Sequence, residues 1–120
     1  MSKNIAKRQD SQVENIEQTR WRKPACDVYE NENEWLITAD IPGVNQDALR
    51  LHLDGSELTI EGRTKSYEDR PSYDGFRRSF SVPAGIDTGK VSAKLHSGVV
   101  AVHLPKSEAI KPRRIAVQAG

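Results

Sequence analysis

The sequence has little of what secreted and membrane proteins need. It contains one cysteine in 120 residues, Cys26, so no disulfide can form within the chain, and a reducing compartment is favoured. No apolar run approaches the length of a membrane span, and residues 1–20 lack the apolar core of a signal peptide. We therefore expect a cytoplasmic protein without a membrane span.

An excess of charge of either sign is also missing. Eighteen Lys and Arg residues balance seventeen Asp and Glu residues, giving a net charge of +1. This balance predicts no broad basic face, so we expect no nucleic-acid partner. Hydrophobic residues make up 36% of the chain and charged residues 29%, which indicates one domain of modest core with a solvated arm or tail.

Motifs for catalysis, cofactors and metals are absent from the pattern as well. The histidines, His52, His96 and His103, fall at polar-face positions of expected strands and are too scattered for metal ligation. Cys26 precedes Asp27, whose charge disfavours a thiolate. Residues 85–91 superficially resemble a phosphate-binding loop, but Val91 stands where a hydroxyl is needed and a strand, not a helix, follows. We predict no enzyme activity, no cofactor and no metal site.

Short alternating segments separated by Gly and Pro dominate what is present. In the hairpin of residues 90–106, Val91, Ala93 and Leu95 alternate with polar residues, and Ser97-Gly98 forms the turn. Pro105 ends its second strand. Further strands are expected at Asp27–Glu30, Trp35–Ile41, Leu49–Leu53, Leu58–Gly62 and Phe76–Val82. The pattern predicts an all-β, antiparallel, immunoglobulin-like β-sandwich.

The chain divides into three parts. Residues 1–23 are polar and are expected to form a flexible arm, residues 24–106 the sandwich, and residues 107–120 a tail. Within the sandwich, Asn45–Asp47 is expected to be a polar loop or one helical turn, and Thr64–Gly75 a loop of about twelve residues. In the extended tail, Ile115 and Val117 project from one side. They either form a last strand of the same sandwich or insert into a groove on another subunit.

Several of these segments carry a recognisable motif set. The hairpin resembles the signature of the small heat shock proteins, the α-crystallin domain, through Ala93-x-x-x-x-Gly98-Val99-Val100-x-Val102-x-x-Pro105-Lys106. The resemblance continues, in the family's order, through Pro24-x-x-Asp27-Val28-x-Glu30, Asp40-Ile41-Pro42-Gly43-Val44, Leu58-x-Ile60-x-Gly62 and Phe76-x-Arg78-x-Phe80-x-x-Pro83. The similarity is of the bacterial type and spans residues 24–117.

The resemblance implies specific contacts between subunits. The tail motif of the family, here Ile115 and Val117, docks between two strands of a neighbouring domain, which implies a groove lined by Leu51, Leu53, Val91 and Ala93. It also implies a dimer interface at Arg78, with Phe76 and Tyr73 beside it. This chain departs from the family in its short polar arm and its short Thr64–Gly75 loop. Dimerisation by a swapped loop strand and pairing through the Phe76–Val82 edge therefore both stay open.

The function implied by the resemblance is that of an ATP-independent holding chaperone, which binds unfolding proteins under stress and suppresses their aggregation. Its expected partners are a second copy in a homodimer, further copies in higher homo-oligomers, non-native client proteins, and ATP-driven refolding chaperones. The alternative is a monomeric adaptor or co-chaperone of the related CS-domain sandwich class, which docks on a larger chaperone. Oligomeric state distinguishes the two interpretations.

Overall fold

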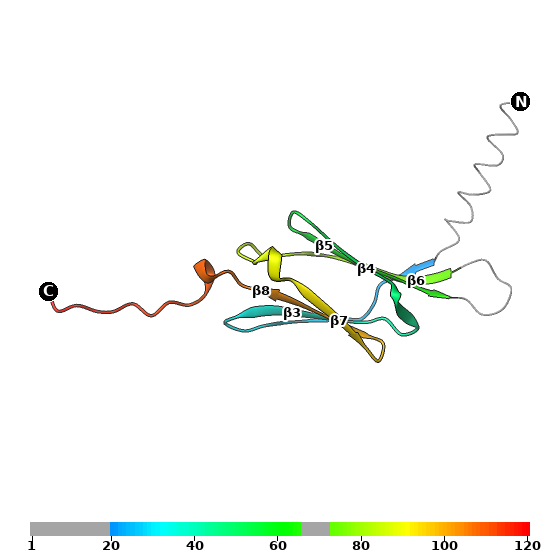
Figure 1. The fold of residues 1–120 in the computed structure, drawn as a ribbon, viewed down its shortest axis with the longest axis horizontal. Coiled ribbons are helices and arrows are strands. Elements are labelled where there is room, and N and C mark those ends of the chain that lie inside the picture. Colours follow the sequence, from blue (N-terminus) through cyan, green and yellow to red (C-terminus); the bar gives the residue numbers. More distant parts are fainter. Residues whose placement is uncertain (1–19, 66–72) are drawn as a thin grey trace, which may run out of the picture.

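Two four-stranded sheets pack face to face in the computed structural model, which describes residues 20–65 and 73–120 (Figure 1). The strands are β1 (Arg20–Arg22), β2 (Cys26–Glu30), β3 (Glu34–Asp40), β4 (Val44–Asp54), β5 (Glu57–Lys65), β6 (Tyr73–Ser81), β7 (Ser92–His96) and β8 (Val99–Pro105). Two short 3-10 turns follow β6 and β8, η1 (Thr88–Lys90) and η2 (Glu108–Ile110). The predicted β-sandwich is confirmed.

Each of the two sheets ends in two edge strands. One sheet runs β1-β6-β5-β4 and the other β2-β3-β8-β7. Every pair is antiparallel except β1 and β6, which are parallel. Strands β4 and β7 are therefore edges, and both contribute side chains to the same side of the core.

The core follows from the alternation along the strands. Side chains at every second position turn inward and are almost inaccessible to solvent, and the innermost include Ile60 of β5 and Val102 of β8, both with 0% exposure. The full set comprises Ile37, Ala39, Ile41, Val44, Leu58, Ile60, Phe76, Val82, Val100, Val102 and Leu104. Because both sheets contribute, burial of this set holds the two layers together.

The β7–β8 hairpin has the expected tight turn. Ser97 and Gly98 have φ values of 49° and 76°, the positive angles that a two-residue turn of this hand requires. The Gly98 carbonyl accepts a hydrogen bond from the Ile41 amide at 2.7 Å. A Cβ on residue 98 would approach the Pro42 Cα to 3.3 Å, so glycine also permits this close contact.

Three boundaries differ from those expected. Strand β1, at Arg20–Arg22, lies within residues 1–23, which were expected to form a flexible arm. Strand β4 includes Asn45–Asp47, with a register shift between Val44 and Leu49, where a loop was expected. The β5–β6 ladder continues to the Lys65–Tyr73 pair, so both ends of the predicted Thr64–Gly75 loop are strand. Residues 66–72 of this loop and residues 1–19 of the predicted arm lie outside the described residues.

Candidate functional site

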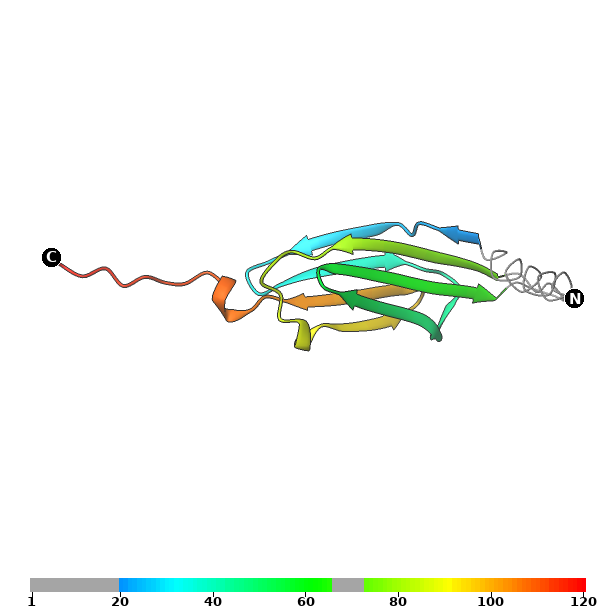
Figure 2. The ribbon, with the colours of Figure 1, turned by 90° about the horizontal axis from the view of Figure 1, so that it is seen from above.

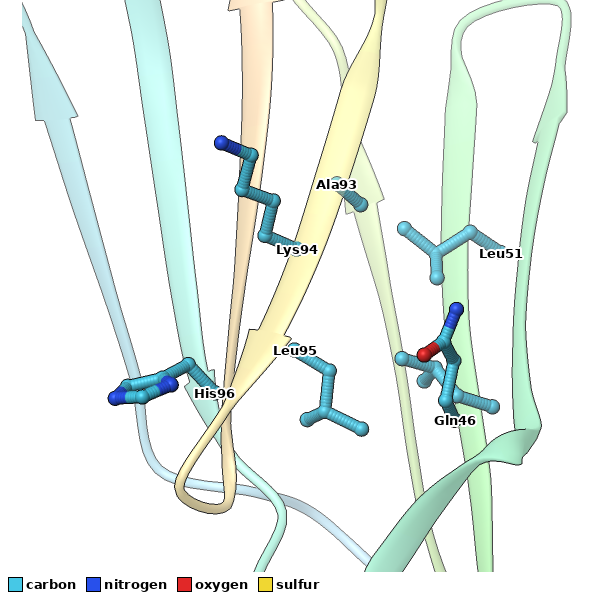
Figure 3. A pocket seen from close by; sticks show the side chains of 7 residues that line it. Gln46, Leu51, Ala93, Lys94, Leu95 and His96 are labelled. Carbon is cyan, nitrogen blue, oxygen red and sulfur yellow. The ribbon is translucent and has the colours of Figure 1, made fainter.

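A groove of about 650 Å³ opens between the edge strands β4 and β7. Its lining residues are Gln46, Leu49 and Leu51 from β4, and Ala93, Lys94, Leu95 and His96 from β7. Figure 3 shows Leu51 facing Ala93 and Leu95 across the gap, whereas Lys94 and His96 lie on the far side of β7. The groove therefore has an apolar interior and a polar rim.

The backbone of the groove also has binding capacity. Among the described residues β4 pairs only with β5, and β7 only with β8. The outward edges of both strands thus carry N–H and C=O groups that an extended peptide could use. Leu49, Leu51 and Leu95 are half-buried against the core, so each keeps part of its side chain for a ligand.

Half of the predicted groove residues line it. Leu51 and Ala93 do, whereas Leu53 and Val91 are half-buried against the core at the other ends of the same segments, outside the groove lining. The predicted set came from the family resemblance, but Leu49 and Leu95 lie on the same two alternating segments, so the sequence pattern contained a signal for them. Gln46 had no such signal, because it enters the groove from the irregular part of β4.

The tail carries its apolar pair fully into solvent. Ile115 is 82% exposed and Val117 95% exposed. Residues 111–120 form no strand, and Figures 1 and 2 show them running away from the sandwich at the end opposite β1. The interpretation of Ile115–Val117 as a last strand of its own sandwich is therefore wrong.

The predicted dimer residues lie on β6. Arg78 is half-buried, donates a hydrogen bond from Nη1 to the Pro24 carbonyl at 3.3 Å, and lies over the Phe80 ring at 5.2 Å. Phe76 is 8% exposed, in the core of its own chain, with the Arg22 guanidinium 4.9 Å from its ring centre. Tyr73 begins the strand opposite Lys65. Phe76 and Arg78 both face the inside of the sandwich. Phe76 is buried, whereas Arg78 is half-buried and carries a polar group at the open edge.

Strand β1 bears on how the edge of β6 can be used. It pairs with Asp74–Phe76, and Asp74 forms ion pairs with Arg20 at 3.5 Å and Arg22 at 4.0 Å. This part of the β6 edge is therefore already occupied by the chain's own backbone. The swapped-strand alternative depends on the Thr64–Gly75 segment, most of which lies outside the described residues.

A smaller apolar cavity of about 240 Å³ lies on the other open side, lined by Val28, Trp35, Ile37, Phe80, Ser81, Val82, Pro83 and Leu104. Lys106 covers the Trp35 ring at 5.7 Å and forms an ion pair with Glu30 at 2.7 Å. This charged pair marks the end of the sandwich from which the tail emerges.

Two titratable side chains of the described segments, Cys26 and His103, have hydrogen-bond partners within the fold. Cys26 is half-buried, its Sγ donates to the Pro24 carbonyl at 3.4 Å, and burial raises the pKa of the thiol although the nearby Arg78 guanidinium opposes the shift. His52 and His96 are exposed as expected, but His103 is half-buried, with Nδ1 2.9 Å from a Glu34 carboxylate oxygen. Within residues 20–65 and 73–120, no group of three or more His, Cys, Asp or Glu could hold a metal ion.

The part of the chain that the structure covers contains no helix that is long and apolar enough to cross a membrane.

Comparison with known proteins agrees with this geometry. Residues 27–118 match the family model described as "Hsp20/alpha crystallin family". Small heat shock protein C4 of Rickettsia felis is 31% identical over 103 residues, covering 78% of this chain and 63% of that protein. Small heat shock protein C2 of the same organism is 32% identical over 104 residues, covering 79% and 68%. The chain thus spans roughly two thirds of the length of these relatives.

A solved structure shares the fold. The small heat-shock protein from Xylella fastidiosa, described as having a distinct high order structure, superposes with a TM-score of 0.64 at 28% identity, covering 82% of this chain and 98% of that one. The family match extends from β2 through the tail motif. The chain therefore belongs to the Hsp20/alpha crystallin family, the small heat shock proteins.

Proposed function

We propose that this protein is an ATP-independent holding chaperone, which binds apolar segments of unfolding proteins and keeps them from aggregating. The observation that carries the proposal is a pair of complementary surfaces in one chain. An open apolar groove lies between β4 and β7, and the tail presents Ile115 and Val117 to solvent, 82% and 95% exposed. A chain with both surfaces can exchange one occupant of the groove for another.

The tail is the proposed resting occupant of the groove on a neighbouring subunit. In an extended segment Ile115 and Val117 point to the same side, where Leu51, Leu95 and Ala93 offer apolar contacts. The free edges of β4 and β7 supply strand-type hydrogen bonds. Because the tail leaves the sandwich in a direction away from its own groove, the docking is proposed between copies.

Assembly is proposed to begin with a homodimer in which Arg78 contributes to the interface, with Phe76 supporting it from the core and Tyr73 beside it. Tails then link dimers into higher homo-oligomers. Dissociation exposes the groove for a client, and release to ATP-driven refolding chaperones completes the cycle in the cytoplasm. None of these steps requires a catalytic group, as in small heat shock proteins generally.

The test is suppression of client aggregation without nucleotide. A heat-labile client is warmed with increasing amounts of the protein, and light scattering is followed with and without ATP. Suppression at near-stoichiometric ratios, equal in both conditions, is expected. Suppression that requires ATP, or none at equal subunit ratios, would contradict the proposal. A mass that stays monomeric at every concentration would instead favour the adaptor class.

Recovery of the client tests the later step. Client held by the protein should regain activity when an ATP-driven refolding chaperone and ATP are added, and not when ATP is left out. Recovery no greater than that of client heated alone would contradict the proposed transfer.

A further inference from the structure

The base of the tail is tied to the loop between β6 and β7. The Ser107 amide donates to the Gly85 carbonyl at 2.7 Å, and the Asp87 amide donates to the Pro105 carbonyl at 2.8 Å. Ile86 forms an isolated bridge with Lys106. The chain is thus held to this loop up to η2, and it is free of backbone pairing only beyond Lys111.

The side chain of Ile110 lies directly on Gly85. A Cβ built on residue 85 would come within 2.6 Å of both Cδ1 and Cγ2 of Ile110, so the isoleucine fills the space that any other residue would need. Gly85 also has a φ of +87°, which side-chain-bearing residues rarely adopt. The contact therefore depends on glycine at position 85 for two independent reasons.

The turn that carries Ile110 is closed by local contacts. The Ile110 amide donates to the Ser107 carbonyl at 3.1 Å, and the Lys111 ammonium lies 2.9 Å from a Glu108 carboxylate oxygen. Pro112 follows, with its φ restricted by the ring. Ile115 comes only five residues after Ile110, a reach of roughly 17 Å for an extended chain. Fixing the base consequently restricts where the apolar pair can go.

We propose that Ile110, seated on Gly85, sets the direction in which the tail leaves the sandwich and so directs Ile115 and Val117 to a second copy of this chain in one defined geometry. The inference rests on the proposed tail docking and adds the residues that position it. A tail with a fixed base loses less freedom on binding and has a higher effective concentration at a neighbour placed to receive it. With a freed base, the tail would meet neighbouring copies in many orientations.

The experiment compares Ile110→Ala with the conservative variant Ile110→Val by native mass spectrometry. Wild type and Ile110→Val are expected to give a narrow set of subunit numbers, and Ile110→Ala at least twice as many. Ile110 is 44% exposed, so the truncation should leave thermal unfolding of the sandwich nearly unchanged. An unchanged distribution for Ile110→Ala would overturn the inference.

A glycine pair supplies a second, matched arm. Gly85→Ala is expected to broaden the distribution as Ile110→Ala does. Gly89→Ala is the control in the same loop, because its Cβ would meet only Asp87 Oδ1 at an ordinary 3.6 Å, and it should behave as wild type. Equal effects of the two substitutions would overturn the assignment of Gly85 as the seat.

A peptide of residues 111–120 separates this inference from the docking on which it rests. It should bind wild type and Ile110→Ala with dissociation constants within twofold, because the groove is untouched. Loss of peptide binding in Ile110→Ala alone would show damage to the groove and overturn the positioning role. A wild-type protein that neither binds the peptide nor exceeds a dimer would refute tail docking itself, and the inference with it.

Discussion

Arg78 is the residue whose environment suggests a contact beyond its own chain. Among the described residues its guanidinium donates to the Pro24 carbonyl at 3.3 Å and lies over the Phe80 ring, close to the Cys26 thiol, and a guanidinium has five N–H donors in all. We predict that Arg78→Ala weakens the dimer by about 1–3 kcal/mol through loss of charge-assisted hydrogen bonds. Dimer dissociation measured by analytical ultracentrifugation checks this.

The neighbouring arginine provides the control. Arg77 lies on the same strand but is exposed, on the opposite face, so Arg77→Ala should leave the dimer constant unchanged. Equal dissociation constants for wild type and Arg78→Ala would refute the interface assignment.

Cys26 yields a prediction about pH. Burial raises the pKa of its thiol in the folded chain, so the folded state holds a proton that the unfolded state has already released as the pH rises past the ordinary thiol value. The thiol's contribution to the free energy of unfolding is fully present below the pKa of the unfolded state. It is lost as the pH rises through the pKa of the folded state. Urea midpoints should therefore drop more between pH 8 and pH 10 for wild type than for Cys26→Ser.

Reactivity of the same thiol gives an independent measurement. Because the thiolate is the nucleophile, alkylation by iodoacetamide at pH 8 should be several-fold slower in the native protein than in the urea-unfolded chain. Equal rates in the two states would show that the Cys26 thiol is not shielded and that its pKa is not raised by folding.

At the scale of the element, β1 depends on one aromatic side chain packed on one glycine. A Cβ at residue 75 would lie 2.6 Å from Trp21 Cζ3 and 2.9 Å from the Gly62 carbonyl oxygen. Trp21 is also flanked by the guanidinium groups of Arg63 and Arg77, at 5.6 and 5.8 Å. We predict that Gly75→Ala displaces Trp21 and releases β1, shifting the emission of Trp21 to the red when measured in a Trp35→Phe background.

A control on the same strand isolates the effect. Ser79→Ala removes only the hydrogen bond between the Ser79 and Thr59 hydroxyls, 3.1 Å apart, and should leave the emission of Trp21 in place. If Gly75→Ala leaves it in place as well, then β1 is held by its ion pairs with Asp74 and not by Trp21.

Strand β1 also shows which part of the fold could not be predicted from the sequence. The seven strands with alternation or turn signals were predictable, but Arg20-Trp21-Arg22 has no alternation, and its strand exists because Trp21 finds a glycine more than fifty residues away. The irregular start of β4 could not be predicted from the sequence for a related reason. Asn45–Asp47 is polar like a loop, and only its pairing to β5 through Val44 makes it strand. In the groove, the family resemblance predicted Leu51 and Ala93, whereas nothing in the sequence pattern indicated the contribution of Gln46.

At the scale of the whole molecule, a single docked tail is a weak link. Burying Ile115 and Val117 contributes roughly 1.5–3 kcal/mol each, and ordering the tail costs about 1 kcal/mol or more per residue. Hydrogen bonds to the groove edges add about 1 kcal/mol each. The balance corresponds to an affinity of about millimolar at best, so only several tails acting together can hold an oligomer.

We therefore predict cooperative disassembly when the apolar pair is removed. Replacing Ile115 and Val117 with Ala should reduce any higher oligomer to dimers, measured by light scattering. Thermal unfolding should stay as in wild type, because both side chains are solvent-exposed. Gln118→Ala, in the same exposed tail, is the control and should keep the oligomer. A double mutant of unchanged size would show that the tail does not link subunits.

The two tryptophans lie at opposite ends of the sandwich, so each is a fluorescence probe of one end. Trp21 rests on Gly75 beside the start of β6, and Trp35 pairs with Leu104 beneath Lys106, where the tail begins. A variant that keeps only Trp21 reports on the end where β1 lies. A variant that keeps only Trp35 reports on the end where the tail begins. On warming, the order in which the two signals change reveals which end loosens first, without any added dye.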